Sequence, residues 1–137
     1  MSDLIEKLAS ELLVPNWRKR KTMAELDVKQ RQAGDVTILD MSGEVRIGEG
    51  SIALRDAVRN LADAGNKKIL LNLAGVRYID SSGIGELIAN YTTVGRTGGQ
   101  LKLLSLTDKV QDLLVITKLL TVFDVYEAEA QALSSFK

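Results

Sequence analysis

The chain has 137 residues, 45% of them apolar, which is enough for one core-bearing domain and too little for two. Its 18 basic and 18 acidic residues cancel, so no global positive field draws it to nucleic acid or to an acidic membrane, and we expect no direct nucleic-acid partner. Cysteine and histidine are both absent, which excludes disulfides, thiolate metal sites and the Ser-His-Asp and Cys-His nucleophile systems and argues against an enzyme.

Residues 1–22 are predicted to be an N-terminal extension that precedes a domain over residues 23–137. The extension begins with apolar residues at helical spacing, which predict a short amphipathic helix: Leu4, Ile5, Leu8, Leu12 and Leu13. This helix either docks on another subunit, giving self-association, or packs on the chain's own domain. The basic segment that follows at residues 17–21 is interpreted as a disordered basic tail rather than as a binding site for anionic lipid or nucleic acid.

The sequence offers no segment for crossing or entering a membrane. No run of roughly 18 apolar residues occurs, which is the length a bilayer span needs. The N-terminus also lacks the charged and then apolar layout of a secretory signal. We therefore expect a cytoplasmic protein with no membrane span.

The domain is predicted to open with a β-hairpin over residues 26–41. Residues alternate at Leu26, Val28 and Gln30, a turn follows at residues 33–35, and the second strand is expected at Val36 to Met41. The stretch 42–50, which contains three glycines, separates this hairpin from the first helix. Ser51 is in the right position to cap that helix, which is expected to end near Gly65.

A β-α-β pattern follows. The nearly continuous apolar run at residues 69–73 predicts a central parallel strand that is buried on both faces. Apolar residues at helical spacing from Ile84 to Val94 predict a second helix, and the glycines after it precede a strand at residues 101–106.

The remaining elements complete the predicted fold. Asp108 and Gln111 have the spacing of a capping box at the start of a third helix. Residues 122–126 are predicted to be an edge strand and residues 127–136 a terminal helix. The fold class is therefore α/β: a mixed β-sheet with helices packed on it, with right-handed crossovers between its parallel strands, plus the N-terminal extension.

The candidate functional segment is Asp80-Ser81-Ser82-Gly83, which joins the central strand to the second helix. Ligands and partners of open α/β sheets usually meet the fold at this edge. The free N–H groups of the first helical turn can accommodate a phosphate on a capping serine. The alternative is purely structural: one serine caps the helix, Asp80 ends the strand, and the glycines allow a tight turn. Gly83 and Gly85 do not form a complete nucleotide-binding loop.

Four stretches together resemble the STAS domain of bacterial anti-sigma factor antagonists, also called anti-anti-sigma factors. The resemblance covers residues 26–136, and the stretches occur in the family's order and spacing: residues 69–73, 78–87, 98–103 and 119–123. It implies a STAS-like mixed sheet and a regulatory protein without catalytic activity.

The resemblance also implies a partner switch. The unphosphorylated domain would bind an anti-sigma factor that is also an ATP-dependent serine kinase, and so free a sigma factor. Ser81 corresponds to the serine that the kinase phosphorylates, and a separate metal-dependent serine phosphatase would reset the switch. ATP and metal would belong to these partners, so we expect no cofactor and no metal on this chain. The predicted partner-binding residues surround Ser81: Arg46, Asp80, Ser81, Ser82, Gly83, Ile84 and Gly85.

Arg46 departs from the family's pattern, because many members carry an acidic residue at this place after Gly43-Glu44-Val45. An arginine there is either a solvated loop residue, a counter-ion for a phosphate, or a sign that the partner differs from a standard anti-sigma kinase or that the protein belongs to a divergent STAS group. The alternative function is accordingly a STAS scaffold subunit of a larger signalling assembly that does not act directly on an anti-sigma factor.

Overall fold

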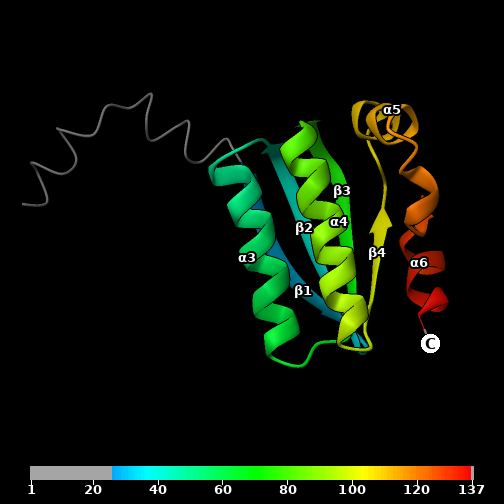
Figure 1. The fold of residues 1–137 in the computed structure, drawn as a ribbon. Helices are drawn as coiled ribbons and strands as arrows, with labels where there is room; N and C mark the ends of the chain where they lie inside the picture. The colour runs from blue at the N-terminus through cyan, green and yellow to red at the C-terminus, as the bar shows by residue number, and fades with distance from the viewer. Residues whose placement is uncertain (1–25, 137) are drawn as a thin grey trace, which may run out of the picture.

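The computed structural model describes residues 26–136, in which a mixed five-stranded sheet carries helices on both faces (Figure 1). The predicted extension at residues 1–22 lies outside the described residues. The strands are β1 (Leu26–Ala33), β2 (Val36–Val45), β3 (Lys68–Ile79), β4 (Gln100–Leu104) and β5 (Val125–Tyr126). The helices are α3 (Glu49–Asp63), α4 (Ser81–Arg96), α5 (Asp108–Ile116) and α6 (Glu129–Ser135), with a short 3-10 turn, η1 (Leu120–Val122).

The predicted hairpin is confirmed, but its second strand is longer than expected. β1 and β2 pair antiparallel around Gly34, which adopts a left-handed φ of 62°. β2 continues to Val45, through the stretch that was expected to end it. The pairing register of β2 against β3 shifts twice in the second half of β2. The extra residues therefore stay in the strand as bulge-like irregularities and do not form a loop.

β3 is the central strand, as its apolar run predicted. It lies between β2 and β4 and is parallel to both. Ile69, Leu70 and Leu71 have no exposed surface, because helices cover both sides of this part of the sheet. The parallel strands β2, β3 and β4 therefore end at one edge of the molecule, where α3, α4 and α5 begin (Figure 1).

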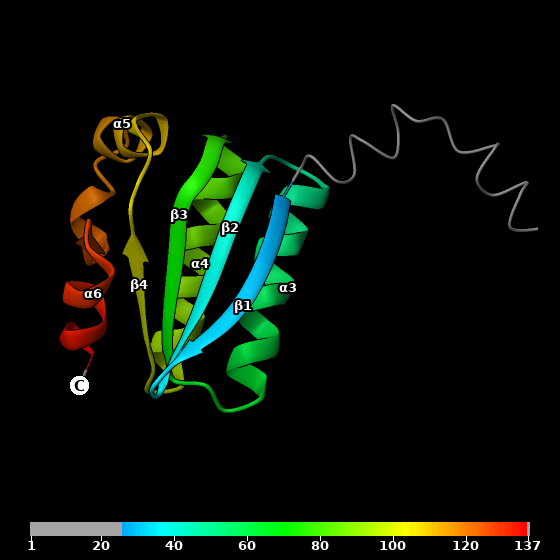
Figure 2. The same cartoon turned by 180° about the vertical axis from the view of Figure 1, so that it is seen from behind.

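The two faces of the sheet carry cores of different size. The helices α3 and α4 cover one face and enclose the larger core, to which α5 adds Val110 and Leu114. Seen from behind, α6 lies beside β4 and covers the smaller core on the opposite face (Figure 2). This smaller core packs Ala132 and Phe136 of the C-terminal region against Leu70 of the central strand.

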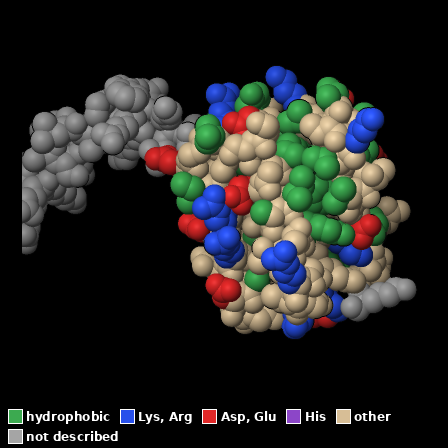
Figure 3. Space-filling view, in the orientation of Figure 1, with side chains coloured by type: hydrophobic (Ala, Val, Ile, Leu, Met, Phe, Trp, Pro, Cys, Tyr) green, Lys and Arg blue, Asp and Glu red, His purple; other side chains and the backbone are tan. Residues whose placement is uncertain are grey.

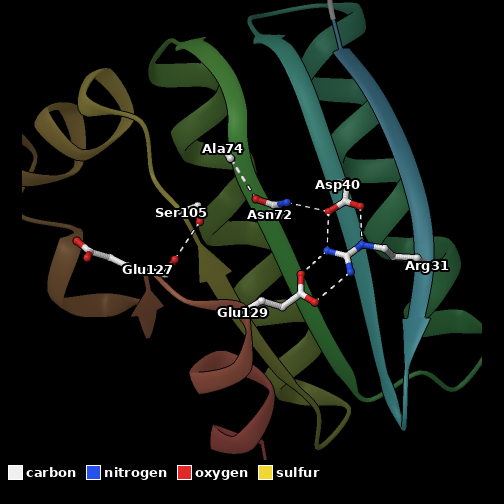
Figure 4. A network of polar contacts seen from close by, with 7 residues as sticks. All are labelled: Arg31, Asp40, Asn72, Ala74, Ser105, Glu127 and Glu129. Carbon is white, nitrogen blue, oxygen red and sulfur yellow. Dashed lines mark hydrogen bonds and ion pairs between the residues drawn. The ribbon is translucent and has the colours of Figure 1, made fainter.

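An ion-pair network fastens α6 to the hairpin on that second face (Figure 4). The Arg31 guanidinium donates to the Asp40 carboxylate at 2.6 Å and to both carboxylate oxygens of Glu129. The Asn72 amide donates to Asp40 at 2.8 Å, which extends the network to β3. Ion pairs thus connect the first residue of α6 to the hairpin.

Several predicted element ends are wrong. The helix α3 begins at Glu49 after Gly48, so Ser51 lies inside its first turn instead of capping it. Thr107 precedes α5, and its hydroxyl donates to the Val76 carbonyl at 2.7 Å, so the predicted capping box does not form. The last two elements are shorter than expected, because β5 has only two residues and α6 begins at Glu129.

Candidate functional site

The candidate site lies at the edge of the sheet where β3 passes into α4. Asp80 is the residue before the helix, and its carboxylate accepts a hydrogen bond from the Gly83 N–H at 2.9 Å. The capping group is therefore the aspartate and neither serine, which corrects the expectation of a capping serine. Ser81 and Ser82 occupy the first two positions of α4.

The Asp80 carboxylate also holds the loop that follows β2. One of its oxygens accepts from the Ile47 N–H at 3.0 Å. Burial by itself would raise the pKa of Asp80, but the N–H groups that donate to the carboxylate outweigh it. The positive charge of Arg46 acts in the same direction, so the pKa of Asp80 lies below its usual value and the group is ionised at neutral pH.

The two serines have different environments. The Ser82 hydroxyl is half-buried and lies 3.0 Å from the hydroxyl of Ser51 on α3. The Ser51 hydroxyl donates in turn to the Arg46 carbonyl at 2.8 Å. The Ser81 side chain is exposed, and its hydroxyl has no hydrogen-bond partner among residues 26–136. Of these two serines, Ser81 is the one whose hydroxyl is free and exposed to the solvent.

Gly83 lets α4 begin in direct contact with the sheet. A Cβ at this position would lie 2.5 Å from the Val45 carbonyl oxygen and 2.5 Å from a side-chain carbon of Ile79. Ile84 is also buried, with 4% of its surface exposed, so its side chain supports the helix from the core side. Gly85 is exposed, and a Cβ there would meet nothing within 4 Å.

Arg46 lies at the same edge but belongs to the loop after β2. Its guanidinium carbon is 4.2 Å from the centre of the Tyr78 ring, and its Nε is 3.2 Å from a Glu44 carboxylate oxygen. The structure thus brings the predicted site residues to one edge of the sheet, where Ser81, Gly85 and Arg46 are exposed. Gly83 and Ile84 were also predicted to bind the partner, but both are buried and position α4 from inside instead.

Three residues at this edge were not predicted from the sequence to belong to the site. Ile47 is 79% exposed although it is apolar, the buried Ser51 contacts the Ser82 hydroxyl, and the Arg46 guanidinium lies over the Tyr78 ring. Of these three residues, Ile47 alone had a local signal in the sequence. It lies between Arg46 and Gly48 in a predicted loop, where an isoleucine has no core to pack into and is expected to be exposed. The partners of Ser51 and Tyr78 are too distant in sequence to be read from spacing.

Neither a metal-ion site nor a membrane-spanning helix is found among residues 26–136. Residues 26–136 contain no group of three or more acidic side chains placed to hold a metal ion. None of the helices in that range is long and apolar enough to cross a bilayer.

Comparisons with known proteins agree with this architecture. A family model described as the STAS domain matches residues 27–132. The anti-sigma-B factor antagonist of Bacillus subtilis (strain 168) is 31% identical over 100 residues, which cover 73% of this chain and 88% of that protein. The crystal structure of a proposed anti-sigma factor antagonist from Thermotoga maritima superposes with a TM-score of 0.74 at 26% identity, over 80% of this chain and 93% of that one.

A fourth comparison concerns the fold alone. The Bacillus cell fate determinant SpoIIAA, solved in its phosphorylated form, is 15% identical and superposes with a TM-score of 0.62 over 79% of this chain and 97% of that one. The sheet order, the helix that begins at Ser81 and the matched residues lead to one assignment. This chain belongs to the STAS domain family, in the group of the anti-sigma factor antagonists.

Proposed function

We propose that this protein is an anti-sigma factor antagonist that is switched by phosphorylation of Ser81. In its unphosphorylated form it binds an anti-sigma factor that is also an ATP-dependent serine kinase, and so frees a sigma factor. The kinase phosphorylates Ser81 and thereby releases the protein, and a serine phosphatase restores the first state. The chain acts in the cytoplasm and without catalysis of its own, while ATP and metal belong to the partners.

The observation that carries this proposal is the contrast between the two serines. Ser81 is exposed at the first position of α4, and its hydroxyl is unbonded among the described residues. Ser82 is occupied by its contact with Ser51. A kinase needs an accessible hydroxyl, and this requirement supports Ser81 as the acceptor. The names of the relatives, one an anti-sigma-B factor antagonist and one solved in a phosphorylated form, support the same function.

The position of Ser81 also explains how a phosphate would act on binding more than on folding. A phosphoserine adds a charge of about −1.5 to −2 at neutral pH. Within the monomer, the N–H groups and the positive dipole end of α4 offset part of this charge. In a complex built on the neutral hydroxyl, the same charge would be buried without a partner, so affinity falls more than stability does.

The test is to incubate the protein with ATP and each serine-kinase anti-sigma factor of its own genome, followed by intact-mass analysis and peptide mapping. Ser81→Ala is compared with the matched variant Ser82→Ala. We expect one phosphate on Ser81, which is absent from Ser81→Ala and present in Ser82→Ala. A phosphate that persists in Ser81→Ala would contradict the assignment. If a candidate binds the protein but none phosphorylates it, the constitutive STAS scaffold becomes the better description.

A further inference from the structure

Two cations meet over one aromatic ring beside the Ser81 site. The guanidinium of Arg46 lies 4.2 Å from the centre of the Tyr78 ring, and the Lys109 ammonium lies 6.0 Å from the same centre. Tyr78 is on β3, Arg46 is in the loop after β2, and Lys109 is on α5. We call these three residues the Tyr78 platform.

The positive charge of the platform is only partly neutralised. Arg46 uses two of its nitrogens toward Glu44, at 3.2 and 3.4 Å, and Glu44 is shared with Arg77, whose Nε is 3.7 Å away. A guanidinium has five N–H donors, so Arg46 keeps donors to spare. No carboxylate of residues 26–136 lies within 4.0 Å of the Lys109 ammonium. The platform is therefore suited to an anionic group.

Exposed apolar side chains lie beside the platform. A hollow of about 300 Å³ opens beside the ring between the end of β3 and α5; Tyr78, Ile79, Lys109, Asp112, Leu113 and Ile116 line it. Ile116 is 76% exposed at its rim, and Ile47, next to Arg46, is 79% exposed. Figure 3 shows basic and apolar side chains next to one another at the end of the molecule where α4 begins. Exposed isoleucines favour a protein surface over a free anion.

The loop that carries Arg46 and Ile47 is held in place from two sides. The Asp80 carboxylate accepts from the Ile47 N–H at 3.0 Å. The Ser51 hydroxyl donates to the Arg46 carbonyl at 2.8 Å. The platform and its flanking isoleucine are thus fixed relative to Ser81 before any partner arrives, which lowers the entropy cost of binding.

We propose that the Tyr78 platform selects the partner: it receives an acidic side chain of the anti-sigma factor, while Ile47 and Ile116 pack against apolar surface of that protein. This inference rests on the proposed function and adds the chemistry of the cognate surface. Arg46 and Lys109 come from different elements and approach the Tyr78 ring from different parts of the chain. A carboxylate must therefore lie at one particular position to contact both cations, so the platform recognises the place of the acidic residue as well as its charge. An anti-sigma factor with a basic residue at that point is rejected.

The experiment measures the affinity of each serine-kinase anti-sigma factor of the genome for the wild type and for three charge reversals. Arg46→Glu and Lys109→Glu alter the platform. Arg96→Glu is the matched control, because Arg96 is exposed in the last turn of α4, at the end opposite Ser81. Far-ultraviolet circular dichroism and thermal unfolding verify that each variant is folded. Binding is measured at low and at physiological salt.

We expect each platform variant to weaken the complex by about tenfold or more, and Arg96→Glu to change it by less than about twofold. The wild-type complex should also weaken as salt rises, because the contact is electrostatic. Should Arg46→Glu disturb the fold, Lys109→Glu decides, since Lys109 is exposed on α5 and makes no ion pair within residues 26–136. Unchanged affinity in the folded platform variants would overturn the inference and leave the proposed function intact. If no anti-sigma factor binds the wild type, both fail.

Discussion

At the scale of single residues, the start of α4 depends on a glycine with no space beside it. Gly83 lies against the end of β2, where an added Cβ would approach the Val45 carbonyl oxygen to 2.5 Å. Two residues further on, Gly85 is on the open side of the same helix and a Cβ there would touch nothing within 4 Å. The two glycines of the candidate site therefore have opposite structural roles.

Alanine at these two positions should have opposite effects on stability. Gly83→Ala is expected to lower the free energy of unfolding by about 1–3 kcal/mol, because backbone of β2 would have to move. Gly85→Ala is expected to raise it by roughly 0.5–1 kcal/mol, since alanine restricts the unfolded chain and suits a helix interior. Urea titration followed by circular dichroism measures both. Equal effects of the two substitutions would be incompatible with the packing of α4 on β2.

At the scale of elements, α6 is attached to the hairpin through charges. The Arg31 guanidinium donates to Glu129 at the start of α6 and to Asp40 on β2, and it holds the pKa of both carboxyl groups below their usual values. A carboxyl group whose pKa is lowered by folding stabilises the fold above the pKa of the unfolded chain, near 4 to 4.5. That stabilisation is lost as the pH falls through the lower value of the folded state.

Glu129→Gln should therefore destabilise the protein at neutral pH and lose its effect in acid. The expected cost at pH 7 is under about 1 kcal/mol, because the pair is exposed to solvent and screened. The matched variant is Glu127→Gln, whose side chain makes no hydrogen bond or ion pair within the described residues. Urea midpoints of the three proteins, measured from pH 7 down to about pH 3, test this. A difference between wild type and Glu129→Gln that grows as the pH falls would refute the assigned direction.

At the scale of the whole molecule, β3 joins the two cores. Leu71 faces the larger core under α3 and α4, and its neighbour Leu70 faces the smaller core under α6. Both are fully buried, so a substitution that moves this strand disturbs the packing on both faces of the sheet.

Leu71→Ala is expected to cost about 2–5 kcal/mol, the price of a cavity in a close-packed core. Val115→Ala, on a side chain that is 53% exposed, should change stability by less than about 0.5 kcal/mol. Thermal and urea unfolding of both variants measure the difference. A loss below about 1 kcal/mol for Leu71→Ala would mean that β3 is not the packed centre of the fold.

The candidate site could be located from the sequence, but its internal arrangement could not. The segment from Asp80 to Gly83 follows an apolar strand and precedes a helical pattern, which was enough to place it at the functional edge. The family resemblance indicated Ser81, but the different environments of the two serines depend on Ser51, which lies 31 positions away from Ser82. Local spacing carries no information about that contact, because it exists only once α3 and α4 pack side by side.

By itself, the sequence determined the type and order of the elements within residues 26–136. Alternation predicted the hairpin, and the apolar run at Ile69–Leu71 predicted a central strand, since an apolar face or strand must be buried whatever else the chain does. Only the tertiary structure decided where the elements end and which side chains remain free. The length of β2 depends on its pairing with β3, and the stacking of Arg46 on Tyr78 joins a loop to that strand. Such contacts depend on the packing of distant segments rather than on local pattern.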